Sequence, residues 1–267
     1  MNTDPRFEIL YEDNHLISVV KPAGILSQSD GSGAEDMLTL LSADIACRRG
    51  KPGKAFVGLI HRLDRNVGGT MFFAKTSKGA SRASEDMRTG NFYKGYLALT
   101  AGRLDGEEGW LRHRLEKEPA ENRVFVSDGG RDCVLYYKWL CSIDATLTAP
   151  GRNVYFAVPV TGRAHQIRAQ FAFSGAPLLG DNKYGPRKRT PGGAQYELGL
   201  WSALASVRKT VVRTERIWVT ALPESAMWRD GEGKLPAEAE AFISSDAVKA
   251  LLPLIKNQSA NGGDGDD

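Results

Sequence analysis

The spacing of apolar residues predicts short strands and two helices in the first hundred positions. Short apolar runs bounded by turn residues predict strands at residues 16–20, 56–60, 70–74 and 92–100. Apolar residues at helical spacing predict helices over residues 34–47 and 77–90. In the last strand the alternation places Lys94, Tyr96 and Ala98 on a polar side. The segment His61–Gly69 lies between two strands and is expected to be a loop.

The second half of the chain continues this mixture. Residues 103–131 are rich in both acidic and basic side chains with little periodicity, which favours a hairpin or long loop over core. Strands are expected at 133–141, 154–160 and 216–222, and helices from 163 to about 174 and over 237–252. Strands and helices mix without strict strand-helix-strand alternation. The pattern therefore favours an α+β fold on a largely antiparallel sheet, as one domain over residues 1–256 with a disordered acidic tail at 257–267.

Composition places the chain among soluble globular proteins. It has 267 residues, of which 42% are hydrophobic and 25% charged, and no apolar run approaches the roughly 20 residues that span a bilayer. The N-terminus has no apolar signal-peptide core, so we expect a cytoplasmic protein. Cys47, Cys133 and Cys141 match neither a disulfide framework nor a zinc motif and are expected to be reduced and buried.

The charge balance adds a weak indication of a polyanionic partner. The formal net charge is +3, but residues 257–267 contain three Asp and no basic residue, so the remainder is more basic than the total suggests. Basic residues cluster at 48–54, 183–189 and 208–216. Such clusters suit contacts with RNA phosphates, although each alone is more often a solvated surface.

Asp64 lies between two arginines in His61-Arg62-Leu63-Asp64-Arg65. A neighbouring guanidinium favours the ionised carboxylate, so Asp64 could serve as a nucleophile or base. A structural ion pair with Arg62 or Arg65 is the alternative, and this motif by itself does not decide between them.

Further motifs favour the catalytic role of Asp64 over a structural ion pair. They are Lys94-Gly95-Tyr96, then Gly162-Arg163-Ala164-His165-Gln166-Ile167-Arg168, then Gly175 to Gly185 with Gly180-Asp181-Asn182-Lys183-Tyr184-Gly185 at its end. Together with Asp64's loop and the opening Lys21-Pro22-Ala23-Gly24, they occur in the order typical of the RluA family of RNA pseudouridine synthases, which this chain resembles over residues 7–222.

The resemblance implies the fold, the activity and the roles of individual residues. It implies the pseudouridine synthase catalytic fold, a largely antiparallel mixed central sheet flanked by helices and loops with an active-site cleft across the sheet. It implies that Asp64 is the catalytic carboxylate, that Tyr96 packs against the target base and can act as a general base, and that Arg168 pairs with Asp64. Ile167 is expected to line the same pocket. Predicted RNA contacts are Arg62, Arg65, Ile167, Lys94, Arg163, Arg187, Lys188 and Arg189.

Two departures from the family pattern affect the expected site. Val67-Gly68-Gly69 stands where the family usually has Thr-Ser-Gly, and Gln170 stands where it has a histidine. The first removes two hydroxyls from the loop of Asp64, and the second alters a helix contact to RNA or to a neighbouring element. The chain also has no segment expected to hold the small S4 RNA-binding domain, so recognition is assigned to the catalytic domain.

The resulting hypothesis is an isomerase that moves uracil from an N1 to a C5 glycosidic linkage in rRNA or tRNA. Attack of Asp64 on C1′, attack on C6, and assisted formation of a glycal all remain open. We expect no cofactor, no metal and no membrane partner, and a monomer that binds RNA. A non-catalytic RNA-binding or RNA-folding protein on the same scaffold is the alternative, and a glycoside hydrolase is disfavoured because no second carboxylate is offered.

Overall fold

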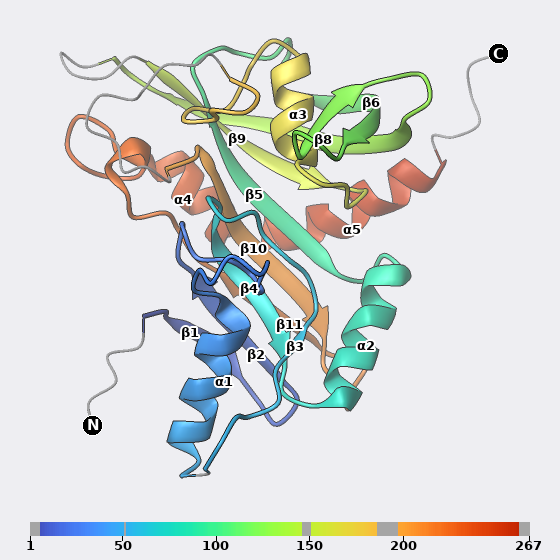
Figure 1. Cartoon of the computed structure of the whole chain (residues 1–267). Helices are drawn as coiled ribbons and strands as arrows, with labels where there is room; N and C mark the ends of the chain where they lie inside the picture. Colours follow the sequence, from blue (N-terminus) through green and yellow to red (C-terminus); the bar gives the residue numbers. More distant parts are fainter. Residues whose placement is uncertain (1–5, 51, 146–150, 186–196, 262–267) are drawn as a thin grey trace. The chain divides into compact units, whose positions relative to one another are not determined.

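A computed structural model describes residues 6–50, 52–145, 151–185 and 197–261 of the chain. Contacts divide the chain into two compact units (Figure 1). Unit 1 comprises Met1–Tyr93 and Ser202–Ala221, and unit 2 comprises Lys94–Trp201 and Leu222–Asp267. Each unit is therefore assembled from two separate stretches of sequence.

Unit 1 contains a sheet and two helices within the described residues. Its strands are β1 (Ile9–Glu12), β2 (Leu16–Lys21), β3 (Gly58–Leu59), β4 (Gly68–Ala74), β10 (Leu200–Arg208) and β11 (Arg216–Thr220). They follow the order β1-β2-β4-β10, with β3 also on β4 and β11 also on β10. Helices α1 (Met37–Arg48) and α2 (Ser77–Arg88) begin where the side chains of Asp36 and Thr76 accept a hydrogen bond from the backbone amide of the third residue of the helix.

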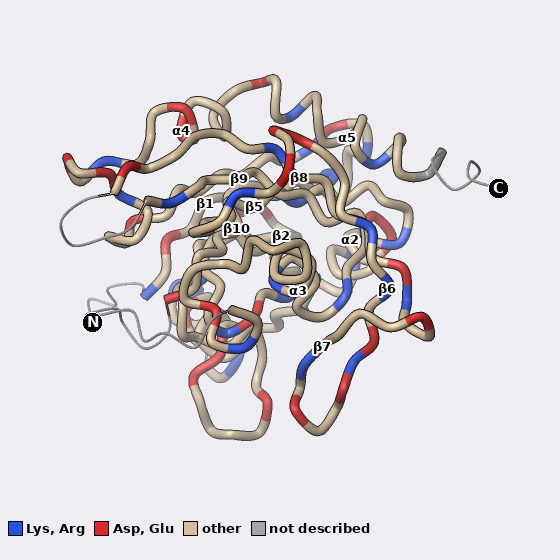
Figure 2. The backbone as a smooth tube through the Cα atoms, turned by 90° about the horizontal axis from the view of Figure 1, so that it is seen from above, with Lys and Arg blue, Asp and Glu red and all other residues tan. Residues whose placement is uncertain are grey.

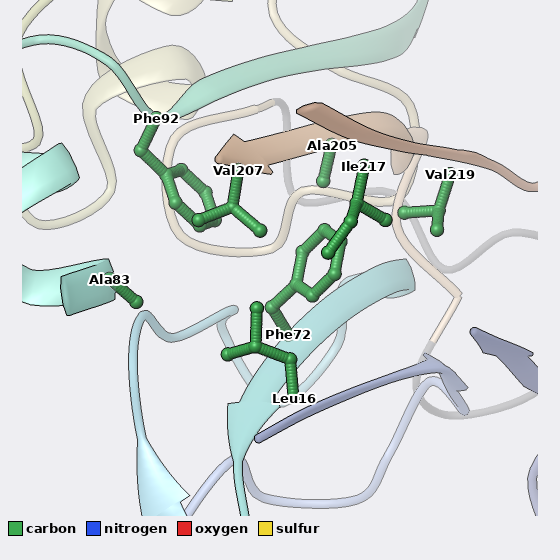
Figure 3. Packing of buried hydrophobic residues seen from close by; sticks show 8 residues of the cluster. All are labelled: Leu16, Phe72, Ala83, Phe92, Ala205, Val207, Ile217 and Val219. Carbon is green, nitrogen blue, oxygen red and sulfur yellow. The ribbon is translucent and has the colours of Figure 1, made fainter. Parts of the chain in front are cut away.

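One face of this sheet carries an apolar core beneath α2. Figure 3 shows the cluster, which draws residues from four strands, from α2 and from the segment before β5: Leu16, Phe72, Ala83, Phe92, Ala205, Val207, Ile217 and Val219. All of these side chains are buried. The strands contributed by the second stretch of unit 1 are therefore needed to complete the core that starts in the first.

Unit 2 is built on a second run of strands in the order β5-β9-β8-β6-β7. Its elements are β5 (Tyr93–Thr100), β6 (Glu108–Glu118), β7 (Arg123–Val126), β8 (Arg131–Ile143), β9 (Arg152–Pro159), α3 (Gln166–Phe173), the 3-10 helix η1 (Ala226–Trp228), α4 (Ala237–Ser244) and α5 (Asp246–Asn261). Tyr155 contacts Phe171 of α3, whereas the next residue of β9, Phe156, contacts Phe242 of α4. Since successive side chains of a strand point to opposite faces, α3 and α4 cover opposite faces of this sheet.

The α+β class and the largely antiparallel sheet are confirmed, because the strand pairs β1-β2, β2-β4, β5-β9, β8-β9, β6-β8 and β10-β11 are all antiparallel. The predicted excursion at 103–131 is the hairpin of β6 and β7 together with the start of β8. Strand β10 was not predicted. Both of its faces are buried, but the buried Ser202 and Ser206 interrupt the continuous apolar run that would indicate such a strand.

Three boundary predictions differ from the structure. Strand β5 has no polar side, since all of its residues except Lys94 are buried. Helix α3 starts only at Gln166, because His165 has a left-handed backbone with φ of 51°. The helix predicted over 237–252 is two helices separated at Ser245, whose extended backbone ends α4 and whose hydroxyl accepts a hydrogen bond from the amide of Val248 in α5.

The C-terminal helix and the cysteines also differ in detail. Helix α5 runs to Asn261, so residues 257–261 are helical where a tail was predicted, and residues 262–267 lie outside the described residues. The three cysteines are unpaired; Cys133 and Cys141 are buried as expected, but Cys47 is exposed because it faces solvent in the last turn of α1. No described helix is both long and apolar enough to cross a membrane.

Candidate active site

The loop that carries Asp64 is pinned by two buried apolar side chains. Leu63 and Val67, on either side of the half-buried Asp64, are 5% and 2% exposed. The amide of Val67 donates to the carbonyl oxygen of Asp64 at 3.0 Å, which closes a turn around the carboxylate-bearing residue. Gly69 then enters β4 with φ of 114°, and a Cβ there would lie 2.2 Å from the carbonyl oxygen of Ser202. Only glycine fits this close approach of two strands.

Hydrogen bonds hold the backbone of the same loop from three further positions. The hydroxyl of Ser27 donates to the carbonyl oxygen of Leu63 at 2.8 Å and accepts from its amide at 3.0 Å. The amide of Phe72 donates to Nε2 of His61 at 2.9 Å. The amide of Gly24 donates to the carbonyl oxygen of Arg65 at 2.8 Å. The position of Asp64 is thereby fixed before any substrate arrives, which is a requirement for a catalytic group.

Lys21 is a functional candidate to which the sequence analysis gave no role. Its side chain is completely buried, and its ammonium donates to the carbonyl oxygens of Pro22, Ile25 and Arg65 at 2.9, 2.6 and 3.1 Å. Burial lowers the pKa of Lys21, attraction to Asp64 raises it and the charge of Arg65 lowers it; together these effects bring the pKa to about 7. The lysine thus joins the Lys21–Ile25 turn to the loop that carries Asp64, and it lies close enough to Asp64 for their charges to interact.

The alternation along β2 could have revealed Lys21. Ile17, Val19 and Lys21 share one face of the strand, and all three are fully buried. A lysine that continues a buried apolar face must find acceptors for its three donors. The turn that follows supplies two of them and the loop of Asp64 supplies the third.

Val67 and Gly68, where the sequence departs from the family pattern, are both buried, and Gly69, which the geometry requires, is retained. The two missing hydroxyls are therefore absent from a buried part of the loop that carries Asp64.

In unit 2, Tyr96 lies on the same face of the sheet as α3. Tyr96 pairs with Ala157 and Ala98 with Tyr155, so these four residues share the face on which Tyr155 contacts α3. Tyr96 is 6% exposed. Lys94 lies on this face too, is half-buried, and has its pKa lowered by burial.

Helix α3 carries Ile167 and Arg168, both buried. The guanidinium of Arg168 forms a bidentate pair with Asp181, in which Nε donates to Oδ2 and Nη2 to Oδ1, both at 2.8 Å. Burial would raise the pKa of Asp181, but hydrogen bonding to Arg168, its charge, and the amides of Lys183 and Tyr184 outweigh burial and lower it. Asp181 belongs to the Gly180–Gly185 motif, but its spacing in the sequence did not identify it as the partner of Arg168. The predicted pairing of Arg168 with Asp64 stays a prediction, since these residues belong to different units.

Gln170 fills its altered position with structural contacts. Its side chain is fully buried, and Nε2 donates to the carbonyl oxygens of Leu111 at 2.8 Å and Cys133 at 3.1 Å. These bonds join α3 to β6 and β8. Of the two roles expected for this position, contact with a neighbouring element is the one the structure supports.

The predicted RNA-contact residues differ in their surroundings. Arg62, Arg65 and Arg163 are exposed, and Arg65 is held by donation of its Nε to the carbonyl oxygen of Gly24 at 2.9 Å. Arg187, Lys188 and Arg189 lie outside the described residues. Contact with RNA stays a prediction for all of them.

The basic cluster at 208–216 is engaged inside unit 1. Asp86, fully buried, accepts from Nε of Arg208 at 2.7 Å and also pairs with Arg213. Arg216 donates to the carbonyl oxygen of Asn91 at 2.8 Å and lies over the ring of Tyr93 at 4.1 Å. Charges used in this way are poorly placed for phosphates, so the structural interpretation of this cluster is favoured.

The hairpin of β6 and β7 carries charges of both signs interspersed along its length (Figure 2). Phe125 and Val126, on β7, are among the exposed large apolar residues. Among the described residues, no three His, Cys, Asp or Glu side chains gather as metal ligands do. The expectation of no cofactor and no metal stays a prediction.

Comparisons with known proteins agree with these motifs. A family model described as RNA pseudouridylate synthase matches residues 15–173. A ribosomal large subunit pseudouridine synthase C of Rickettsia typhi is 33% identical over 188 residues, covering 68% of this chain and 58% of the relative. One of the same name from Vibrio vulnificus is 30% identical over 209 residues, covering 78% and 62%. The chain thus spans less than two thirds of the length of these curated relatives.

The fold also matches a solved structure. Human RNA pseudouridylate synthase domain containing 1 superposes with a TM-score of 0.69 at 18% identity, covering 95% of this chain and 97% of the other. This likeness concerns the fold alone. With the family model, it confirms the resemblance and the fold class predicted from the motifs.

Proposed function

The chain belongs to the RNA pseudouridylate synthase family, and we propose that it isomerises uridine to pseudouridine in RNA with Asp64 as the catalytic nucleophile. The observation that carries this proposal is the loop of Asp64. Buried anchors, the hydroxyl of Ser27 and the ammonium of Lys21 hold its backbone around a half-buried carboxylate. A surface ion pair would not need a loop fixed from so many positions.

The reaction sets the tasks of the remaining groups. The N1–C1′ bond breaks, the uracil turns, a C5–C1′ bond forms, C5 loses its proton and N1 ends with one, so the product is an isomer of the substrate. Asp64 acts at C1′, at C6 or in forming a glycal. Tyr96 supplies a ring against the base and a hydroxyl that accepts the proton from C5. In this proposal Arg168 pairs with Asp64, as the family resemblance implies, and Ile167 lines the pocket and helps to exclude water.

Exposed arginines would hold the RNA by its phosphates. Arg62 and Arg65 flank Asp64, Arg163 precedes α3, and all three are exposed. Lys94 lies on the face of Tyr96, and Arg187, Lys188 and Arg189 are assigned the same task from the sequence. Phosphate contacts fix register without reading sequence, so the choice of uridine rests on the shape of the pocket.

Ribosomal RNA is the substrate that the names of the relatives favour. Transfer RNA remains the second substrate class from the sequence analysis. We assign the protein to the cytoplasm as a monomer without a cofactor. A non-catalytic RNA-binding protein is the competing function. Its one argument is the altered Val67-Gly68-Gly69 segment, in which Val67 and Gly68 are buried.

Tritium release from RNA labelled at uridine C5 tests the proposal. Asp64→Asn should abolish release and leave RNA affinity near that of the unaltered protein, because the amide keeps the shape but cannot act as nucleophile or base. Asp30→Asn, in an exposed loop of the same unit, should retain full activity. Asp64 is not the nucleophile if Asp64→Asn turns over within about tenfold of the unaltered protein, a loss too small for a nucleophile. Binding without release by the unaltered protein would instead favour the non-catalytic alternative.

The salt dependence of binding tests the phosphate contacts. The logarithm of affinity should fall linearly with the logarithm of salt concentration, by roughly 0.7 to 0.9 per phosphate neutralised. Replacing Arg62 and Arg163 by Ala should flatten the slope for cognate and unrelated RNA alike. Replacing Arg208 and Lys209, from the internally engaged cluster, should leave it unchanged.

A further inference from the structure

The turn between β6 and β7 is tied to the segment that follows α3. Nζ of Lys183 donates to the carbonyl oxygens of Asn122 at 2.7 Å and Glu121 at 3.3 Å. The hydroxyl of Tyr184 accepts a hydrogen bond from the amide of Val124, the second residue of β7, at 2.9 Å. Two consecutive side chains thus hold the turn and the strand that follows it.

The same two residues hold the partner of Arg168 through their backbone. The amides of Lys183 and Tyr184 donate to Oδ1 of Asp181 at 3.0 and 3.1 Å. That oxygen also accepts from Nη2 of Arg168 at 2.8 Å. A displacement of Lys183 or Tyr184 therefore reaches the carboxylate that orients Arg168 with no flexible link between them.

Tyr184 also contacts Arg168 and Arg123 through its ring and His165 through its hydroxyl. Its ring lies 5.3 Å from the guanidinium carbon of Arg168 and 5.5 Å from that of Arg123. Its hydroxyl lies 2.8 Å from Nδ1 of His165, the residue immediately before α3. The left-handed backbone of His165 sets where that helix starts.

The hairpin needs such ties because it is thin. At its tip the hairpin consists of two strands, since β7 pairs with β6 over four residue pairs. Two-stranded ribbons are only marginally stable alone. Apart from Val124, the residues of β7 are exposed. The position of the turn is thus set largely by the contacts of Val124 with the core cluster of Leu115, Cys133 and Ala169 and by Lys183 and Tyr184.

We propose that Tyr184 is a positioning residue that makes the orientation of Arg168 depend on the placement of the β6–β7 turn. This inference rests on the proposed function for its catalytic consequence. It predicts that removing one hydroxyl at the hairpin turn lowers turnover more than it lowers RNA affinity.

Tyr184→Phe is the decisive variant, because it keeps the ring and removes both contacts of the hydroxyl. Tyr155→Phe is its matched control, since the hydroxyl of Tyr155 accepts from the amide of Leu104 at 2.8 Å in the same unit. One hydrogen bond corresponds to roughly a three- to tenfold effect. In Tyr184→Phe, hydrogen exchange at the Val124 amide should rise and kcat should fall by about this factor, with KM within about twofold. In Tyr155→Phe, exchange should rise at Leu104 and kcat should not change.

The Nε–H resonance of Arg168 gives a readout that does not need activity. It should shift in Tyr184→Phe and stay in place in Tyr155→Phe. Faster exchange at Val124 with unchanged kcat and an unchanged Arg168 resonance would overturn the inference, since the hydroxyl would then only brace the hairpin. If the unaltered protein releases no tritium from any RNA, the proposed function fails, and the Arg168 resonance still decides the inference.

A second variant removes the parallel tie. Lys183→Met keeps the aliphatic stem and loses the two bonds to the turn. Because both side chains join the same two segments, the double variant should lose more turnover than the product of the two single effects. Purely multiplicative effects would mean that the two residues act independently, against a shared link to Arg168.

Discussion

The two units bury a cation in opposite ways. In unit 1 the ammonium of Lys21 is surrounded by three carbonyl oxygens, whereas in unit 2 the guanidinium of Arg168 meets the carboxylate of Asp181. Carbonyl oxygens satisfy the donors of Lys21 and fix the backbone that supplies them, but they carry no charge, so its pKa falls to about 7. The negative charge of Asp181 compensates the positive charge of Arg168, and this pairing lowers the pKa of Asp181. One arrangement braces a loop, and the other orients a side chain.

The two arrangements should respond to opposite ends of the pH scale. Lys21 has a pKa near 7 when folded and about 10.4 when unfolded, so the unfolded state binds more protons between these values and stability rises with pH across that window. Asp181 has a lowered folded pKa, so its contribution is present above the unfolded value of about 3.9 and is lost as the pH falls through the folded pKa.

Asp181→Asn should give the largest effect, because it removes the charge of the buried carboxylate that forms the bidentate pair with Arg168. We expect the free energy of unfolding to fall by about 3–5 kcal/mol in urea denaturation, with loss of activity. Asp132→Asn is the control, since Asp132 is largely exposed beside Arg114 and should change stability by less than about 0.5 kcal/mol. A loss below about 1 kcal/mol for Asp181→Asn would show that Arg168 is not dependent on this carboxylate.

Arg168→Lys should have the next largest effect. Lysine keeps the charge but cannot form the two parallel bonds to Asp181, which we expect to cost about 1.5–3 kcal/mol of unfolding free energy. Tritium release should fall by about 100-fold or more, because the position of the charge in the site is lost. Activity close to that of the unaltered protein would mean that a point charge suffices and that the geometry of the pair is incidental.

Lys21→Met should destabilise by about 1 kcal/mol at pH 7. The carbonyl oxygens of Pro22, Ile25 and Arg65 lose their donor, but the penalty for a buried ammonium is also removed. The clearer signature is in the pH profile, where the rise in stability between about pH 7 and 10 should disappear. Lys54→Met, at an exposed position of the same unit, should keep that rise. A rise that persists in Lys21→Met would assign it to another group.

Asp64→Asn should have the smallest of these effects, a shift in the pKa of Lys21. Removing the negative charge removes an attraction that raises the pKa of Lys21, so the ¹⁵Nζ resonance of Lys21 should titrate at lower pH, by less than about one unit. Asp30→Asn should leave the titration in place. An unmoved midpoint in Asp64→Asn would mean that the two charges do not interact.

The sequence predicted strands that form short apolar runs and helices whose apolar residues recur at helical spacing. Strands β2 and β4 and helix α2 follow this rule. Strand β10 was missed because the buried Ser202 and Ser206 interrupt its apolar run, and the break at Ser245 was missed because the apolar spacing of α4 continues into α5. Polar residues buried inside a strand interrupt the apolar run on which such predictions depend.

The candidate site shows the same limit in its contacts. Motif order identified Asp64, Tyr96 and Arg168, but Lys21 and Asp181 acquire their roles only from the positions of atoms distant in sequence. The acceptors of Lys21 include Arg65, 44 positions away, and the carboxylate that holds Arg168 is 13 positions away across a change of chain direction. Both residues stood inside quoted motifs, yet nothing in the spacing states which atom faces which.

The discontinuity of unit 1 has a consequence during synthesis on the ribosome. Its first stretch ends at Tyr93 and its second begins at Ser202, where β10 supplies the neighbour of β4 and the close approach at Gly69. At about 5–20 residues per second, the roughly one hundred intervening residues delay that partner by about 5–20 seconds. Throughout this interval the nascent chain holds β4 with an unpaired edge and the loop of Asp64 without its neighbouring strand. Ribosome-associated chaperones would meet an incomplete sheet, and synonymous codon changes between positions 94 and 201 would alter how long it persists.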